Sequence, residues 1–154
     1  MRYDRTPVVG WREWVALPDL GISAIKAKVD TGARTSSLHA FDVQIARREG
    51  ISVVRFKVHP FQRDSHQVVA VVAKLVDQRW VKSSAGHETL RPVIETDVQL
   101  MGGRWAIEFT LVQRDTMGFR MLLGRQALRR RFVVDPGRSY LAGRGPRVKR
   151  RTRT

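Results

Sequence analysis

Three consecutive residues, Asp30, Thr31 and Gly32, have the types and the order that acid–base chemistry on a peptide bond requires. They follow the strand-like run 24–29, so the carboxylate comes directly after a strand. Gly32 lets the backbone turn sharply and bring its N–H close to the carboxylate. The Thr31 hydroxyl can hold that turn. We expect Asp30 to lie at the floor of a cleft, as an aspartic peptidase requires. The alternative is an ordinary turn aspartate.

This chemistry needs a second carboxylate. One ionised Asp activates a water as a base while a protonated partner donates to the scissile carbonyl. Two close carboxylates cannot both be ionised, so the pair shares a proton and titrates as a unit. The second half of the chain contains no other Asp-Thr-Gly or Asp-Ser-Gly. The sequence therefore predicts a C2 homodimer in which each copy supplies one Asp30.

The elements that must position this turn are short strands separated by turns. Valine-rich and alternating segments predict a mostly β chain, a barrel or sandwich. Residues 125–131 form the one convincing helix, about two turns long, and Pro18 to Gly21 predict a turn. Strands are expected at 8–17, 22–29, 37–43, 51–58, 67–76, 91–100, 105–113, 121–123, 132–134 and 139–141, and residues 80–82 continue or pair with the strand before them.

A second motif, Met121-Leu122-Leu123-Gly124-Arg125, lies about 90 residues after the first. Together the two motifs resemble the retropepsins, the single-lobe aspartic peptidases of the retroviral type. A closer resemblance is to a bacterial retropepsin-like family often labelled "ATP-dependent zinc protease", found beside glutamate-adding ATP-grasp ligases. The matching motifs are Gly10-Trp11-Arg12-Glu13, Ala27 to Ser36, Leu38-His39-Ala40, Val81-Lys82-Ser83-Ser84, Arg91-Pro92-Val93-Ile94 and Met121 to Arg125.

The resemblance implies a single-lobe retropepsin-like (acid protease) β-barrel with one short C-terminal helix. It makes Asp30 catalytic, with Thr31 and Gly32 holding the turn. Ala33 and Gly124 become structural residues near the site, and Gly124 allows close packing beneath the turn. The expected organisation is a lead-in at 1–7, a peptidase domain at 8–142 and a basic, disordered tail at 143–154.

Two arginines and a serine pair are the candidate substrate-binding residues. Retroviral relatives commonly have an Asp where this chain has Arg34, paired with the arginine that matches Arg125. Two guanidiniums near the cleft would suit carboxylate groups of an acidic substrate. Alternatively, Arg34 points into solvent. Ser83 and Ser84 lie where retropepsins carry the flap, and the segment 82–88 is either a mobile cover or a plain surface loop.

The net charge of +15 concerns partners more than fold. Acidic peptides, nucleic acid and the ribosome are all candidates. With the genomic company of the resembling family, the charge suggests glutamate-extended protein tails, including a polyglutamylated ribosomal protein. Residues 144–154 hold six basic residues and are either a polyanion-binding tail that could contact nucleic acid or a solvated tail. A non-catalytic basic β-barrel that binds RNA or the ribosome is the second hypothesis.

Other classes find less support. The chain has no cysteine, no apolar run long enough to span a membrane and no apolar signal core at its start, so we expect a cytoplasmic protein without membrane contact. The four histidines are widely spaced and form no His-Glu-x-x-His motif; no Walker loop and no Gly-x-Ser-x-Gly elbow are present. We therefore expect no metal and no cofactor. A zinc-dependent hydrolase is the third hypothesis.

Overall fold

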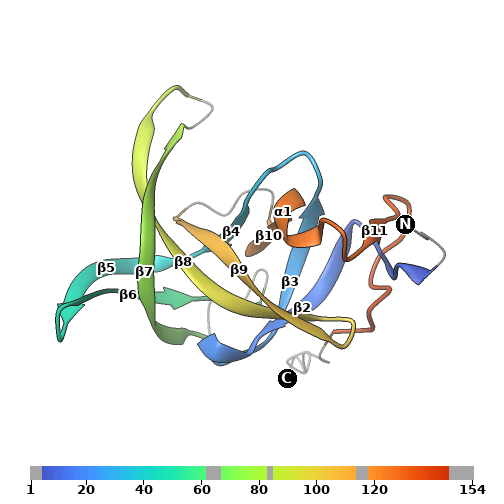
Figure 1. Cartoon of the computed structure of the whole chain (residues 1–154), viewed down its shortest axis with the longest axis horizontal. Coiled ribbons are helices and arrows are strands. Elements are labelled where there is room, and N and C mark those ends of the chain that lie inside the picture. Colours follow the sequence, from blue (N-terminus) through green and yellow to red (C-terminus); the bar gives the residue numbers. More distant parts are fainter. Residues whose placement is uncertain (1–4, 62–66, 83–84, 114–117, 146–154) are drawn as a thin grey trace, which may run out of the picture.

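The computed structural model describes residues 5–61, 67–82, 85–113 and 118–145. Strands make up most of this part of the chain, and the α-helix is a single turn (Figure 1). The elements are β1 Val8–Val9, β2 Arg12–Leu17, the 3₁₀ helix η2 Pro18–Leu20, β3 Ile22–Asp30, β4 Ser36–His39, β5 Phe41–Arg48, β6 Ile51–Val58, β7 Val69–Lys82, β8 Glu88–Leu100, β9 Gly103–Val112, β10 Met121–Gly124, α1 Arg125–Leu128 and β11 Val133–Val134.

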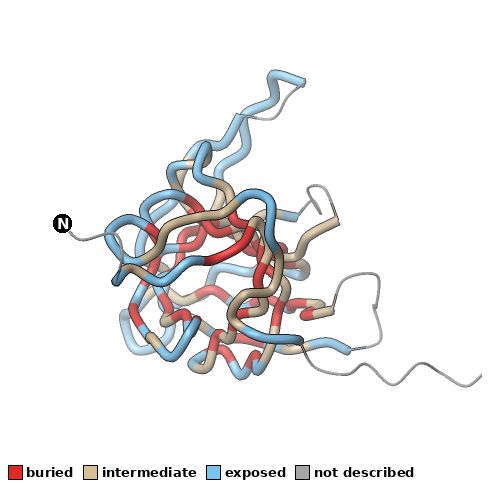
Figure 2. Tube along the Cα trace, turned by 90° about the vertical axis from the view of Figure 1, so that its right-hand side faces the viewer, coloured by how far each residue is buried: buried red, intermediate tan, exposed pale blue. Residues whose placement is uncertain are grey.

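Six strands close into a barrel in the order β2-β3-β10-β4-β9-β8, because β2 pairs with both β3 and β8. Alternate residues along β2, β3 and β9 point inward and form the core, where Ile25, Leu38 and Phe109 are completely buried. Buried residues accordingly gather at the centre of the trace (Figure 2). The predicted mostly β, single-lobe barrel with one short helix late in the chain is confirmed.

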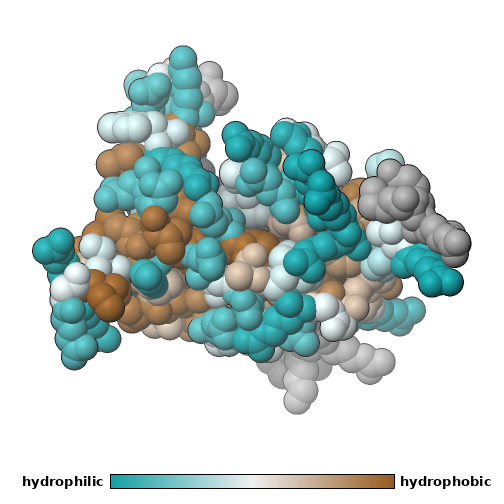
Figure 3. Space-filling view, in the orientation of Figure 1, coloured by the Kyte–Doolittle hydropathy of each residue, from teal (hydrophilic) through white to brown (hydrophobic). Residues whose placement is uncertain are grey.

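Three further strands, β7, β6 and β5, extend the sheet outward from β8. β7 and β8 are the longest strands, and their hairpin projects beyond the barrel as an exposed arm (Figures 1 and 2). Apolar side chains also gather on the surface along β7 (Figure 3). Trp80 on this arm is 67% exposed and lies opposite Leu90, which is also exposed.

Local structure departs from the sequence prediction at five places. The strand expected over 8–17 is two strands, β1 and β2, in different sheets. The helix ends at Leu128 instead of Arg131, and Arg130 takes a left-handed φ of 66° that an α-helix does not accommodate. The strand expected over 37–43 is two strands that separate at Ala40. The turn at 18–21 is a short 3₁₀ helix, and residues 139–141 form no strand.

The two ends of the described chain meet on one side of the barrel. β1 and β11 form a parallel two-stranded sheet. Residues 135–145, the C-terminal strap, then cross β2. The carboxylate of Glu13, which is completely buried, accepts hydrogen bonds from the backbone N–H groups of Gly10, Leu141 and Ala142 at 2.6, 3.0 and 2.9 Å. These bonds tie the C-terminal strap to the start of β2.

Candidate active site

Asp30 is the last residue of β3, and its side chain is held by the turn that follows. Oδ1 accepts hydrogen bonds from the N–H groups of Gly32 at 2.9 Å and Ala33 at 3.3 Å. Within the described ranges, no residue hydrogen-bonds Oδ2. The turn thus fixes one carboxylate oxygen with backbone donors and leaves the other available to a ligand or a water molecule. Both residues that act on Oδ1 were predicted to lie at the turn.

The second motif lies directly beside the turn. β10 runs parallel to β3 and places Gly124 opposite Asp30. A Cβ on Gly124 would overlap the carbonyl of Thr35 and come within 3.0 Å of the carbonyl oxygen of Ala33, so only glycine fits. The Gly124 N–H donates to Ser36 Oγ at 3.0 Å. This geometry supports the predicted close packing beneath the turn.

Arg125 holds the turn from the other side. Its Nη1 donates to the carbonyl oxygen of Thr31 at 3.0 Å, and its backbone N–H donates to the carbonyl of Ala33 at 2.7 Å. Arg34 is exposed, and its carbonyl accepts from Gln126 N–H at 3.1 Å. The structure thus gives Arg125 a positioning contact that the sequence did not predict. Substrate binding by either arginine remains a prediction.

The expected flap coincides with the tip of the projecting arm. β7 ends at Lys82 and β8 begins at Glu88, with the two residues in register. Ser83 and Ser84, predicted to bind substrate, lie outside the described residues. In Figure 1 the arm and the turn after β3 both project toward the same end of the molecule.

The motif at 10–13 supports β3, the strand that ends at Asp30, a role that sequence reasoning missed. The Val29 N–H, next to Asp30, donates to the carbonyl of Trp11 at 2.8 Å. The Arg12 guanidinium lies between two rings, 4.6 Å from the centroid of Trp11 and 4.8 Å from that of Tyr140. One signal was present: Glu13 shares the inward side of β2 with Val15 and Leu17. A charged side chain at a core position indicates that the fold supplies hydrogen-bond partners for it.

The described residues contain no cluster of side chains arranged to bind a metal ion. In those ranges, no three His, Asp or Glu side chains come together in a way that could hold an ion. The same residues contain no helix long and apolar enough to cross a membrane.

Comparison with known proteins agrees with this geometry. The sequence profile of the RimB-like family, described as the retropepsin-like aspartic endopeptidase RimB, matches residues 8–145. The chain therefore belongs to the RimB-like family of retropepsin-like aspartic endopeptidases. This match confirms the predicted resemblance to a bacterial retropepsin-like family, which rested on motifs spread over the same part of the chain.

Longer relatives carry a different name. The chain is 46% identical over 140 residues to a probable alpha-L-glutamate ligase of Shewanella pealeana, and 47% identical over 129 residues to one of Desulfotalea psychrophila. These matches cover 91% and 84% of this chain but only 31% and 28% of the relatives, so the chain spans about a third of their length. A Legionella pneumophila protein of unknown function has a similar crystal structure, with a TM-score of 0.73 and 27% identity over 88% of this chain and 98% of that one.

Proposed function

We propose that this chain is an aspartic endopeptidase in which Asp30 from two copies activates a water molecule. The observation that carries the proposal is the Asp30 carboxylate, with Oδ1 fixed by two backbone N–H groups and Oδ2 left available. One carboxylate takes a proton from the water as its oxygen adds to the scissile carbonyl carbon. The other donates a proton to the carbonyl oxygen, which gives a tetrahedral gem-diol. The first carboxylate then passes the proton that it took from water to the amide nitrogen as the C–N bond breaks, and the second recovers a proton from the gem-diol, which leaves an amine and a carboxyl group.

The substrate we propose is an acidic, glutamate-extended protein tail, of which a polyglutamylated ribosomal protein is one example. Two observations support it. Exposed arginines surround the turn in a chain of net charge +15. Proteins named probable alpha-L-glutamate ligases also contain a segment similar to this chain, which joins a named glutamate-adding activity to a retropepsin-like segment in one polypeptide.

The decisive experiment uses subunit mixing. Asp30→Asn protein should cleave no acidic peptide while its thermal unfolding stays close to that of the unchanged protein. If the two carboxylates come from two copies, adding excess Asp30→Asn protein to active protein should lower the activity per active chain as mixed dimers form. Activity that stays proportional to the unchanged protein alone would show that one chain suffices. Full activity of Asp30→Asn would exclude the aspartic mechanism.

A further inference from the structure

A groove beside the catalytic turn lies between α1 and the unpaired edge of β9. Residues Gly103 to Glu108 of β9 pair with β8, and no second strand in the described chain pairs with them. The hollow next to this edge measures about 340 Å³. We call it the α1–β9 groove; its walls are Ala106, Ile107 and Glu108 on one side and Gln126, Arg129 and Arg131 on the other.

The charge in the α1–β9 groove is positive. Glu108 is already neutralised, because Arg79 Nη2 contacts its Oε2 at 2.6 Å, and this hydrogen bond raises the pKa of Arg79. Arg129 and Arg131 have no ion pair with any residue that the structure describes. Arg131 instead lies 4.7 Å above the ring of Trp105. Hydrophilic side chains gather over α1 in the space-filling view (Figure 3).

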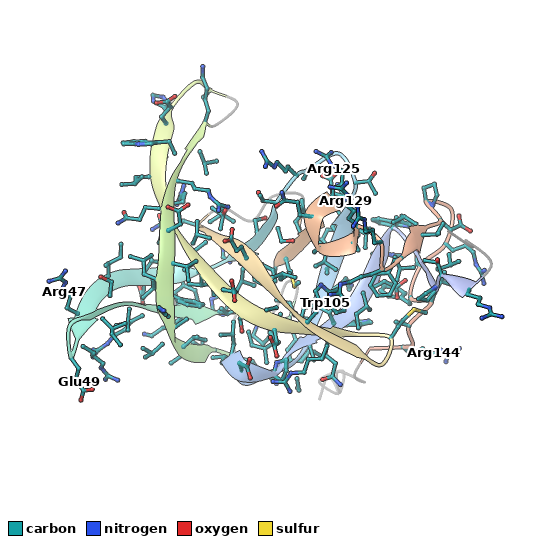
Figure 4. The ribbon with its side chains drawn as sticks, in the orientation of Figure 1. Arg47, Glu49, Trp105, Arg125, Arg129 and Arg144 are labelled. Carbon is teal, nitrogen blue, oxygen red and sulfur yellow. The ribbon has the colours of Figure 1, made fainter. Side chains whose placement is uncertain are left out.

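The α1–β9 groove adjoins a second hollow that includes a residue of the catalytic turn. Arg129 lines the groove and also lines this second hollow of about 390 Å³, which includes Thr31 and Arg125. At its inner end the groove reaches Ser36, whose Oγ accepts from Gly124. Figure 4 shows Arg125 and Arg129 close together over α1, with Trp105 below them on β9. Arg129 thus borders both the groove and the hollow beside the turn, and Arg125 lines the latter.

We propose that the α1–β9 groove is an exosite that binds the extended acidic part of the substrate, away from the scissile bond. An unpaired strand edge offers backbone donors and acceptors to an extended peptide, and arginines offer forked donors to its carboxylates. Trp105, which lines the groove, is 9% exposed, and its buried Nε1 has no acceptor within the described ranges. The inference rests on the proposed function for its substrate.

A single-stranded nucleic acid fits the α1–β9 groove less well. Sequence-independent binding of single strands combines basic residues with aromatic faces on which bases stack. The aromatic residue of the groove, Trp105, is buried, and Arg131 covers its ring. The groove therefore offers charge and a strand edge but no open stacking face, and this favours an acidic peptide.

The test compares two peptides that share one scissile sequence, one short and one extended by six glutamates at either end. In Arg129→Gln/Arg131→Gln protein, each lost exposed arginine contact should weaken binding about 2–5-fold. KM for the extended peptide should therefore rise about 4–25-fold, with kcat and the short peptide unchanged. The matched control is Arg47→Gln/Arg48→Gln, which removes the same charge from the distant β5–β6 hairpin (Figure 4) and should change neither peptide.

The exosite proposal is wrong if Arg129→Gln/Arg131→Gln raises KM equally for the short and the extended peptide. It is also wrong if the control variant raises KM for the extended peptide as much as Arg129→Gln/Arg131→Gln does. Because Arg131 also covers Trp105, Arg129→Gln alone provides a variant that leaves this contact in place. Binding of a ten-residue glutamate peptide to Asp30→Asn protein separates the two hypotheses. If Arg129→Gln/Arg131→Gln weakens this binding but the unchanged protein cleaves no peptide, the proposed function is wrong and the exosite stands. If the unchanged protein cleaves peptides but the two arginines do not affect binding, the proposed function stands and the exosite is wrong. If single-stranded RNA binds more tightly than the peptide, and replacing the same two arginines abolishes that RNA binding, the assignment of a peptide ligand is overturned.

Discussion

Glu13→Gln tests how the buried carboxylate holds the C-terminal strap. Oε2 accepts two backbone N–H groups and Oε1 accepts one. The single oxygen of an amide can keep at most the first two, so the third N–H, of Ala142, would face an N–H₂ group. A hydrogen bond to a charged group contributes about 1.5–3 kcal/mol to stability. The free energy of unfolding should therefore fall by about 1.5–3 kcal/mol.

The assay is urea unfolding followed by fluorescence, with thermal unfolding in parallel. For a domain of this size the loss corresponds to a fall in Tm of about 3–12 °C. Glu108→Gln is the matched control, because it makes the same substitution in a surface ion pair whose side chains are 42% and 36% exposed. Such pairs contribute about 0–1 kcal/mol. If Glu13→Gln destabilises the protein no more than Glu108→Gln does, the buried carboxylate does not hold the strap.

Three further predictions concern the site. Gly124→Ala should lower the free energy of unfolding by about 1–3 kcal/mol through overpacking, and it should abolish peptide cleavage. The control is Gly103→Ala, whose added Cβ would have its nearest neighbour at 3.4 Å. In unfolding and peptidase assays this control should leave stability and cleavage nearly unchanged. Arg34→Ala should lower turnover of acidic peptides more than of neutral ones; equal losses would mean that Arg34 is structural. Peptide cleavage should persist in strong chelators and without ATP, and loss that zinc restores would instead identify a zinc hydrolase.

The turn around Asp30 could be predicted because its causes are local. A strand followed by Asp-Thr-Gly indicates a carboxylate at a sharp turn, and the structure places Gly32 N–H on that carboxylate. The contact between Arg125 and the Thr31 carbonyl could not be predicted, because it joins residues 94 positions apart and depends on the rotamer of one exposed side chain.

The predicted helix was too long for a related reason. Arg129, Arg130 and Arg131 are good helix formers, so propensity alone extends the helix through them. Tertiary contacts stop it earlier: the ring of Phe132 lies 5.6 Å from that of Trp105, and Val133 pairs with β1. The chain reaches these positions by a left-handed residue at Arg130. The partners of Glu13 were equally hidden, because Leu141 and Ala142 lie 128 and 129 residues away.

The parallel pairing of β3 with β10 has a consequence for biosynthesis. The floor of the catalytic turn comes from residues synthesised about 94 positions after Thr31. At about 5–20 residues per second, a ribosome takes about 5–20 s to add them. Until then the Asp30 turn lacks Gly124 and Arg125, and contacts of such long sequence separation form slowly. The growing chain therefore cannot assemble this turn until residues 124 and 125 have been synthesised.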